Sequence, residues 1–217
     1  MIKLCMFDLD GTLADTIEDL ANAMNYALNK NGFLSHDVEA YKIFVGDGVV
    51  KLAQRASGSD DVNMHKKLVT SFDEYYSAHL TDKTKPYDDC VQMLEKLNEQ
   101  GIKCGVLSNK PHKYVDRILS KLYPNFNFVC KLGKREGFEP KPNPTALLQE
   151  LEKLNIGKDE CLYIGDSNVD IRTAKNAGAR SCGITWGFRT REELELEGAE
   201  YVVNNPIEIC KLCAEYN

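Results

Sequence analysis

The sequence of 217 residues lacks any long uninterrupted run of apolar residues, and it contains no low-complexity tract. Without an apolar run of about 18 residues, a helix that crosses a membrane is excluded. The 15 glycines and 7 prolines are ordinary numbers, which excludes a collagen-like chain. With 43% hydrophobic and 28% charged residues, the composition is that of a globular protein with one or two domains.

Positive charge is also scarce. The 27 Lys and Arg residues face 33 Asp and Glu residues, which gives a formal net charge of −6, and no stretch of the chain is basic. We therefore expect neither nucleic acid nor an anionic membrane as a partner. An anionic substrate would need a few placed cationic side chains or a bound metal ion.

The eight cysteines could form four disulfides, but their positions argue against this. Five lie inside short apolar runs, where Cys behaves as a small hydrophobic residue: Cys5, Cys104, Cys130, Cys161 and Cys182. Cys210 and Cys213 form a C-x-x-C pair with no second pair or His cluster, which favours one face of the last helix over a metal site. The first residues run into Asp8 without a signal-cleavage pattern, so we expect a cytoplasmic protein with reduced thiols.

Apolar runs of strand length alternate with helical patterns along most of the chain. The predicted strands are Ile2–Leu9, Ile102–Leu107, Phe126–Cys130, Cys161–Ile164, Arg180–Ile184 and Tyr201–Val203. Helical spacing of apolar residues occurs between these runs, for example at Leu147, Leu148, Leu151 and Leu154. This alternation predicts an α/β fold with a Rossmann-like parallel sheet and helices on both faces.

Residues 15–84 interrupt the alternation, because they contain three or four helical patterns and no convincing strand. Apolar stripes at helical spacing include Ile17, Leu20, Ala21, Met24, Ala27 and Leu28, and then Leu68, Val69, Phe72 and Tyr76. The sequence thus predicts an α/β core domain formed by residues 1–14 and 85–217, with an all-helical domain of residues 15–84 inserted after the first strand.

Polar side chains form four groups along the chain, three at the ends of predicted strands and one in a proline-rich loop. Asp8 and Asp10 end the first strand, spaced to point to one side of an extended chain, and Gly11 and Thr12 follow in a tight turn. Ser108 and Asn109 end the next strand.

The other two groups lie later in the chain. Lys141 lies between Pro140 and Pro142, which fix an extended backbone, and Asn143 and Pro144 predict a helix start. Asp166 and Asp170 follow the Cys161–Ile164 run and are spaced to share one face of a helix.

Because the carboxyl ends of parallel strands share one edge of a sheet, we expect these groups to converge. Several carboxylates cannot all ionise in one cleft without a compensating cation. A donor set made of oxygen atoms suits a hard ion, so the sequence predicts a Mg²⁺ site with room for a phosphate beside Ser108 and Lys141.

These four ordered groups resemble the motifs of the haloacid dehalogenase superfamily of phosphohydrolases, and the resemblance covers the whole chain, helical insertion included. Within the superfamily the sequence is most similar to phosphoglycolate phosphatases, in the segments 19–23, 45–48, 108–111 and 184–187. One departure is Asp47, where those enzymes often carry Asn. A negative charge there would be unfavourable beside a substrate carboxylate.

The resemblance implies a small-molecule phosphate monoester as substrate and a role for each residue. Asp8 would attack phosphorus, and Asp10 would act as acid and base. Asp8, the Asp10 carbonyl, Asp166 and Asp170 would hold or support Mg²⁺. The phosphoryl oxygens would bind to Ser108, Asn109, Lys141 and the backbone N–H groups of Gly11 and Thr12.

Several alternatives remain open at this point. Pyrophosphatases, nucleotidases and sugar-phosphate phosphatases share the same frame, and β-phosphoglucomutases carry a similar inserted domain. A non-catalytic phospho-signalling receiver module uses related residues, but it is shorter and has no insertion. The sequence also leaves open whether Trp186 and Phe188 face a substrate or the core, which residues of the insertion select the substrate, and the oligomeric state.

Overall fold

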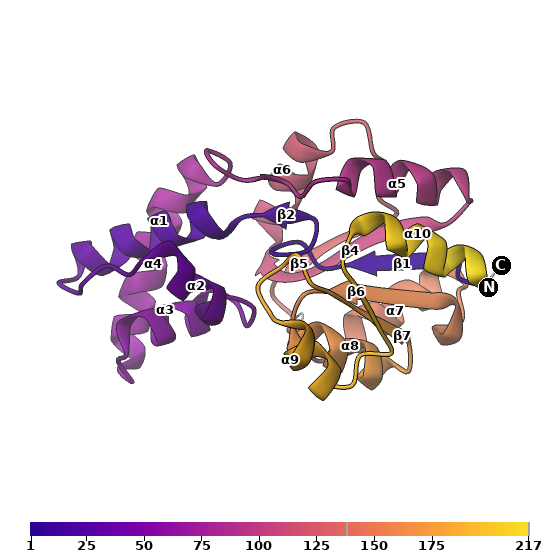
Figure 1. Ribbon diagram of the computed structural model, residues 1–217. Coiled ribbons are helices and arrows are strands. Elements are labelled where there is room, and N and C mark those ends of the chain that lie inside the picture. The colour runs from indigo at the N-terminus through magenta and orange to yellow at the C-terminus, as the bar shows by residue number, and fades with distance from the viewer. Residues whose placement is uncertain (138, 217) are drawn as a thin grey trace. The chain divides into compact units, whose positions relative to one another are not determined.

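A six-stranded sheet organises the larger part of the computed structural model, which describes residues 1–137 and 139–216 (Figure 1). The strands pair in parallel in the order β5-β4-β1-β6-β7-β8. Their bounds are β1 Leu4–Phe7, β4 Lys103–Pro111, β5 Lys131–Lys134, β6 Cys161–Gly165, β7 Arg180–Ile184 and β8 Tyr201–Val203. The strand order changes direction between β1 and β6, so the predicted Rossmann-like sheet is confirmed, and this switch point is where such sheets bind ligands.

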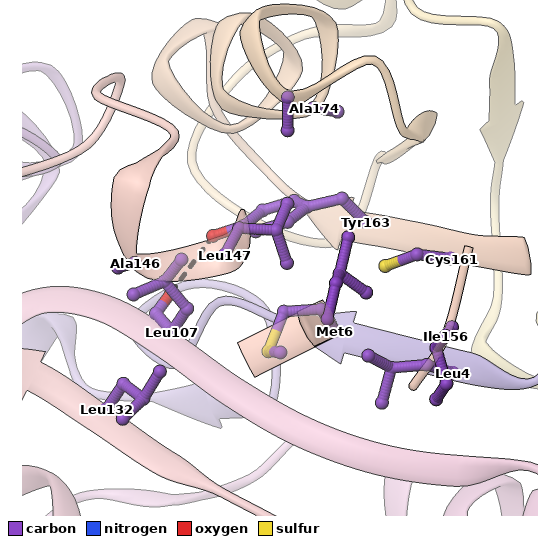
Figure 2. Packing of buried hydrophobic residues seen from close by; sticks show 12 residues of the cluster. Leu4, Met6, Leu107, Leu132, Ala146, Leu147, Ile156, Cys161, Tyr163 and Ala174 are labelled. Carbon is purple, nitrogen blue, oxygen red and sulfur yellow. Dashed lines mark hydrogen bonds between the residues drawn. The ribbon is translucent and has the colours of Figure 1, made fainter. Parts of the chain in front are cut away.

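Helices cover both faces of the sheet, which explains why its central strands are apolar throughout (Figure 1). One face packs against α7 (Thr145–Leu154) and α8 (Asn168–Ala177), and Figure 2 shows Met6, Leu107 and Leu147 in this layer. The other face packs against α5 (Cys90–Glu99) and α10 (Pro206–Glu215), where the Cys5 and Cys213 sulfur atoms lie 3.7 Å apart. All eight cysteines, each within the described residues, are free thiols.

The remaining helices of this unit are α6 (His112–Leu122), α9 (Arg191–Leu196) and a 3₁₀ turn at Lys158–Glu160. Within residues 1–137 and 139–216, no helix has the combination of length and hydropathy that crossing a membrane requires.

The strand predicted at Phe126–Cys130 is wrong in position, because β5 begins only at Lys131. The rings of Phe126 and Phe128 contact each other, and Phe128 also packs edge-on against Tyr123, just past the end of α6, with centroids 5.9 Å apart. These aromatic contacts fold the segment over the end of α6, and the chain extends only after them.

The chain folds into two compact units, an α/β unit of residues 1–14 and 86–217 and a helical unit of residues 15–85. The helical unit contains α1 (Ile17–Lys30), α2 (Val38–Phe44), α3 (Val49–Ser57) and α4 (Val62–His79). The apolar stripe predicted on α1 is buried, and on α4 Leu68, Phe72 and Tyr76 are buried. Packing of α1 against α4 therefore forms the core of this unit.

The chain passes between the units through two short segments that form a two-stranded sheet, β2 (Ala14–Asp15) and β3 (Lys85–Pro86). Close to them, the buried Asp19 carboxylate accepts hydrogen bonds from the N–H groups of Lys83 and Thr84 and from the Thr84 hydroxyl, at 2.7–3.1 Å. A charged acceptor thus fixes the return segment to the first turn of α1.

Candidate active site

The predicted convergence at one edge of the sheet is present in the α/β unit. Asp8 follows β1 directly and Asp166 follows β6 directly, so both carboxylates lie at the switch point of the sheet. Together with Asp170 they form the acidic cluster, in which one oxygen of each carboxylate lies within 4.8 Å of the others. All three side chains are buried.

One ammonium group contacts two of these three carboxylates. Lys141 Nζ lies 3.0 Å from Asp8 Oδ1 and 2.7 Å from Asp170 Oδ1, and the side chain of Lys141 is buried. Burial alone would lower the pKa of Lys141, but the carboxylates of Asp170 and Asp8 raise it well above its usual value. Lys141 therefore carries a positive charge in the site.

The acidic cluster has more negative charge than Lys141 balances. Burial raises the pKa of Asp8 to about 6, although Lys141 opposes this, and burial together with the charges of Asp170 and Asp8 raises the pKa of Asp166 to about 8. The raised pKa values mean that the three carboxylates do not readily ionise together beside a single ammonium. A divalent cation would allow them to do so, and their oxygen donors suit Mg²⁺. The residues present thus fit the predicted metal.

The Asp170 side chain is fixed by the start of α8. Its Oδ2 accepts hydrogen bonds from the Ser167 N–H at 3.1 Å and from Ser167 Oγ at 2.6 Å, which is a capping box. A Cβ atom at position 165 would lie 2.2 Å from Asp170 Cγ, so only Gly165 permits this approach. The predicted helix face shared by Asp166 and Asp170 is not formed, because α8 begins at Asn168 and Asp166 lies in the preceding turn.

Asp166 is oriented by two neighbouring loops. Its Oδ2 accepts a hydrogen bond from the Phe188 N–H at 2.8 Å, and its Oδ1 lies 3.4 Å from Thr12 Oγ1. Trp186 Nε1 donates to the Thr12 carbonyl at 3.0 Å, and both Trp186 and Phe188 are half-buried. The segment after β7 therefore supports the acidic cluster and the first loop by direct hydrogen bonds.

The first loop contains Asp10, Gly11 and Thr12. Gly11 has a φ of 83°, the left-handed backbone that glycine adopts without strain, so the predicted tight turn is present. The Gly11 N–H donates to the Ala14 carbonyl at 2.9 Å and the Thr12 N–H to the Leu9 carbonyl at 3.2 Å. Both N–H groups, which sequence reasoning assigned to phosphate, are thus paired inside the turn.

Ser108 and Asn109 lie on β4, which continues four residues beyond the predicted end at Leu107. Asn109 Oδ1 accepts from the Lys141 N–H at 2.8 Å, and Asn109 Nδ2 donates to the Lys141 carbonyl at 3.2 Å. This pair of bonds fixes the loop that carries Lys141. The helix after this loop, α7, starts at Thr145, one residue later than predicted, and Asn143 Oδ1 accepts from the Thr145 N–H.

Sequence reasoning missed one buried charge at this edge. Lys110 Nζ lies 2.9 and 3.1 Å from the two carboxylate oxygens of Asp10, and the Lys110 side chain is only 3% exposed. A lysine one residue after Asn109 gives no signal by itself, because the prediction ended the strand before it.

The chain resembles a known protein family and several known proteins over most of its length. Residues 5–184 match the model of the haloacid dehalogenase-like hydrolase family. The chain is 34% identical to a phosphoglycolate phosphatase of Vibrio parahaemolyticus, with 98% of this chain and 96% of that protein covered. It is 30% identical to a phosphoglycolate phosphatase of Pseudomonas putida, with 98% and 80% covered.

Solved structures with a similar fold have related descriptions. A protein described as a predicted phosphoglycolate phosphatase from Haemophilus somnus superposes with a TM-score of 0.90 at 28% identity, with 97% of each chain covered. A protein described as a predicted phosphatase from Clostridium acetobutylicum superposes with a TM-score of 0.88 at 29% identity, with 99% of each chain covered. The fold, the buried aspartates after β1 and β6 and these relatives lead to one conclusion: the chain belongs to the haloacid dehalogenase-like hydrolase family, as a phosphoric monoester hydrolase.

Proposed function

We propose that this enzyme hydrolyses a small phosphate monoester of the phosphoglycolate class, through an aspartyl-phosphate on Asp8 and with Mg²⁺ as cofactor. The observation that carries the proposal is the excess negative charge of the acidic cluster, which contains Asp8. A site with this charge is unfavourable when empty and would be favourable around a divalent cation, which would supply positive charge for the phosphate that Asp8 attacks.

In the proposed reaction, an oxygen of Asp8 attacks phosphorus and the bond from phosphorus to the leaving oxygen breaks. Asp10 gives its proton to that leaving oxygen, which departs as an alcohol. Asp10 then takes a proton from a water molecule as the water attacks the aspartyl-phosphate, so that phosphate leaves and the Asp8 carboxylate is restored.

The other residues bind and orient. Asp8, the Asp10 carbonyl and Asp166 would hold Mg²⁺, with Asp170 supporting them; the metal would supply positive charge for the phosphoryl oxygens. Lys141 and Ser108 would bind the phosphoryl oxygens. We assign Asn109 a positioning role, since its amide holds the Lys141 loop.

We further propose that the helical unit is a cap that selects the substrate, and that the protein acts on a phosphorylated metabolite in the cytoplasm. The negative charge of Asp47 would be unfavourable beside a substrate carboxylate, but a neighbouring cation reduces this effect. Arg55 Nη2 lies 2.5 Å from Asp47 Oδ2 and offsets that charge within the helical unit. The names of the relatives then favour phosphoglycolate over the other small phosphates.

A phosphate-release screen with Mg²⁺ tests the proposal, over phosphoglycolate, pyrophosphate, nucleotides and sugar phosphates. We expect the highest kcat/KM for phosphoglycolate. A higher value for another compound would overturn the substrate class while leaving the mechanism intact. Conversion of glucose 1-phosphate into glucose 6-phosphate, without release of phosphate, would instead indicate a phosphomutase. Full turnover after exhaustive chelation would contradict the metal assignment.

A further inference from the structure

Lys110 is a buried lysine to which the reaction described above gives no role. Its side chain is 3% exposed, and that of its partner Asp10 is 13% exposed. Lysine is almost never buried unless it is paired, because removal of the ammonium from water is unfavourable. The contact with both oxygens of Asp10, at 2.9 and 3.1 Å, compensates for that burial.

We propose that Lys110 is the positioning residue that holds the Asp10 carboxylate in the orientation required for proton transfer to and from the reacting oxygens. The inference rests on the proposed function, since it takes the acid–base role of Asp10 from it. Lys110 would act on the proton-transfer steps and not on binding of the phosphoryl group.

The backbone around Lys110 is built to hold it in place. The Lys110 N–H donates to Ser108 Oγ at 3.3 Å, and the following Pro111 restricts Lys110 to extended conformations. The pairing of β4 with β5 shifts register between Leu107 and Pro111, and irregular pairing of this kind, as in a β-bulge, redirects side chains beside active sites. On the β5 side, a Cβ atom at Gly133 would lie 2.6 Å from the Lys110 carbonyl oxygen, so a glycine is needed for this packing.

The adjacent residues Asn109 and Lys110 at the end of β4 hold two different parts of the site. Asn109 binds the backbone of the Lys141 loop, whereas Lys110 binds the side chain of Asp10. One strand end therefore fixes both the cation that faces Asp8 and the carboxylate that would exchange the proton. Lys110 contacts both Asp10 oxygens in the structure. If it remains hydrogen-bonded to only one of them during the reaction, the other oxygen can exchange a proton with the leaving group.

A double-mutant cycle with Lys110→Met and Asp10→Asn tests the proposal on the full-length enzyme with Mg²⁺. We expect Lys110→Met to lower kcat for phosphoglycolate by up to about 10²-fold, with KM little changed, because a small misplacement of a catalytic group has effects of this size. In the Asp10→Asn background, the same substitution should change kcat less than about twofold, since the two residues act as one unit.

A second measurement compares substrates with different leaving groups. A purely structural role for Lys110 would not make the effect of Lys110→Met depend on the leaving group. For p-nitrophenyl phosphate, whose leaving group needs little protonation, rapid-quench kinetics should show the burst of nitrophenol nearly unchanged in Lys110→Met. Lys110→Arg keeps the charge and should restore part of the loss on phosphoglycolate. The matched control is Lys103→Met, at the exposed start of the same strand, which should leave both activities unchanged.

Three results would overturn the inference. A loss that persists in the Asp10→Asn background would mean that Lys110 acts independently of Asp10. A rise in KM alone would make Lys110 a substrate-binding residue. Equal losses on both substrates, together with a lower melting temperature and no recovery in Lys110→Arg, would make it structural. If the wild-type enzyme released no phosphate from any compound, the proposed function itself would fail, which the wild-type control reveals.

Discussion

Asp19 in the helical unit and Asp166 in the α/β unit are buried to nearly the same degree, at 2% and 1% exposed, but their surroundings are opposite in kind. Neutral donors surround Asp19: two backbone N–H groups and one hydroxyl. Asp166 has a backbone N–H and a distant hydroxyl, and it shares its site with two further carboxylates. Burial of a carboxylate therefore does not identify a functional site, whereas burial with unbalanced charge does.

The strongest test of this contrast is Asp8→Asn, which removes one charge from the acidic cluster. We expect kcat to fall by roughly 10⁴–10⁶-fold, since the nucleophile is lost. The melting temperature without metal should not fall, because Lys141 keeps its partner Asp170 while one buried charge disappears. Phosphate release and thermal unfolding, measured on the same preparation, check both parts. A marked loss of stability would mean that Asp8 stabilises the fold as Asp19 does.

The next largest effect is expected for the stabilisation of the fold by Mg²⁺, which should depend on pH. The pKa of Asp166 is raised from its usual value to about 8, so its proton stabilises the metal-free fold at low pH and this contribution is lost as pH rises through about 8. A divalent cation competes with that proton. Saturating Mg²⁺, worth about 3 kcal/mol at a hundred times its Kd, should therefore raise the melting temperature more at pH about 8.5 than at about 5.5.

Asp166→Asn is the matched control for this measurement. It should abolish most of the Mg²⁺-induced rise at both pH values, which separates the site from weak binding elsewhere on an acidic chain. An equal rise at the two pH values in the wild type would contradict the proton competition.

A smaller effect is expected from Asp19→Asn. Loss of the charged acceptor should lower the free energy of unfolding by about 1.5–3 kcal/mol, the usual contribution of hydrogen bonds to a charged group. Activity on p-nitrophenyl phosphate should remain, since Asp19 belongs to the helical unit and not to the acidic cluster. Urea unfolding and an aryl phosphatase assay check this. If activity disappeared without loss of stability, Asp19 would have a role in catalysis.

The smallest effect is expected at Asp47, a half-buried carboxylate that forms an ion pair with Arg55. Asp47→Asn should change the free energy of unfolding by less than about 1 kcal/mol, as is usual for pairs that water and salt screen. Chemical denaturation at low and high salt checks this. A loss as large as that for Asp19→Asn would show that the pair stabilises the loop between α2 and α3.

The positions of the site residues explain which of them could be predicted from the sequence and which contacts could not. Asp8 and Asp166 were predictable because each follows a buried apolar run, and parallel strands share an edge. The Asn109–Lys141 contact joins residues 32 apart and depends on where two loops meet, which no local pattern encodes. The Lys110–Asp10 pair depends on a strand that continues through a register shift, and strand ends are the least reliable part of a sequence prediction.

The pairing of β2 with β3 also has a consequence for the order in which the chain can fold. Phe7 of β1 pairs with Val106 of β4, a contact that closes a loop of roughly 100 residues in an unfolded chain. Once the helical unit has folded, its two ends are one strand spacing apart, so the loop that remains to be closed is roughly 30 residues. The conformational entropy of closing it is then smaller by about 1 kcal/mol. A different folded insert with equally close ends should therefore leave assembly of the sheet unimpaired, which makes the helical unit exchangeable.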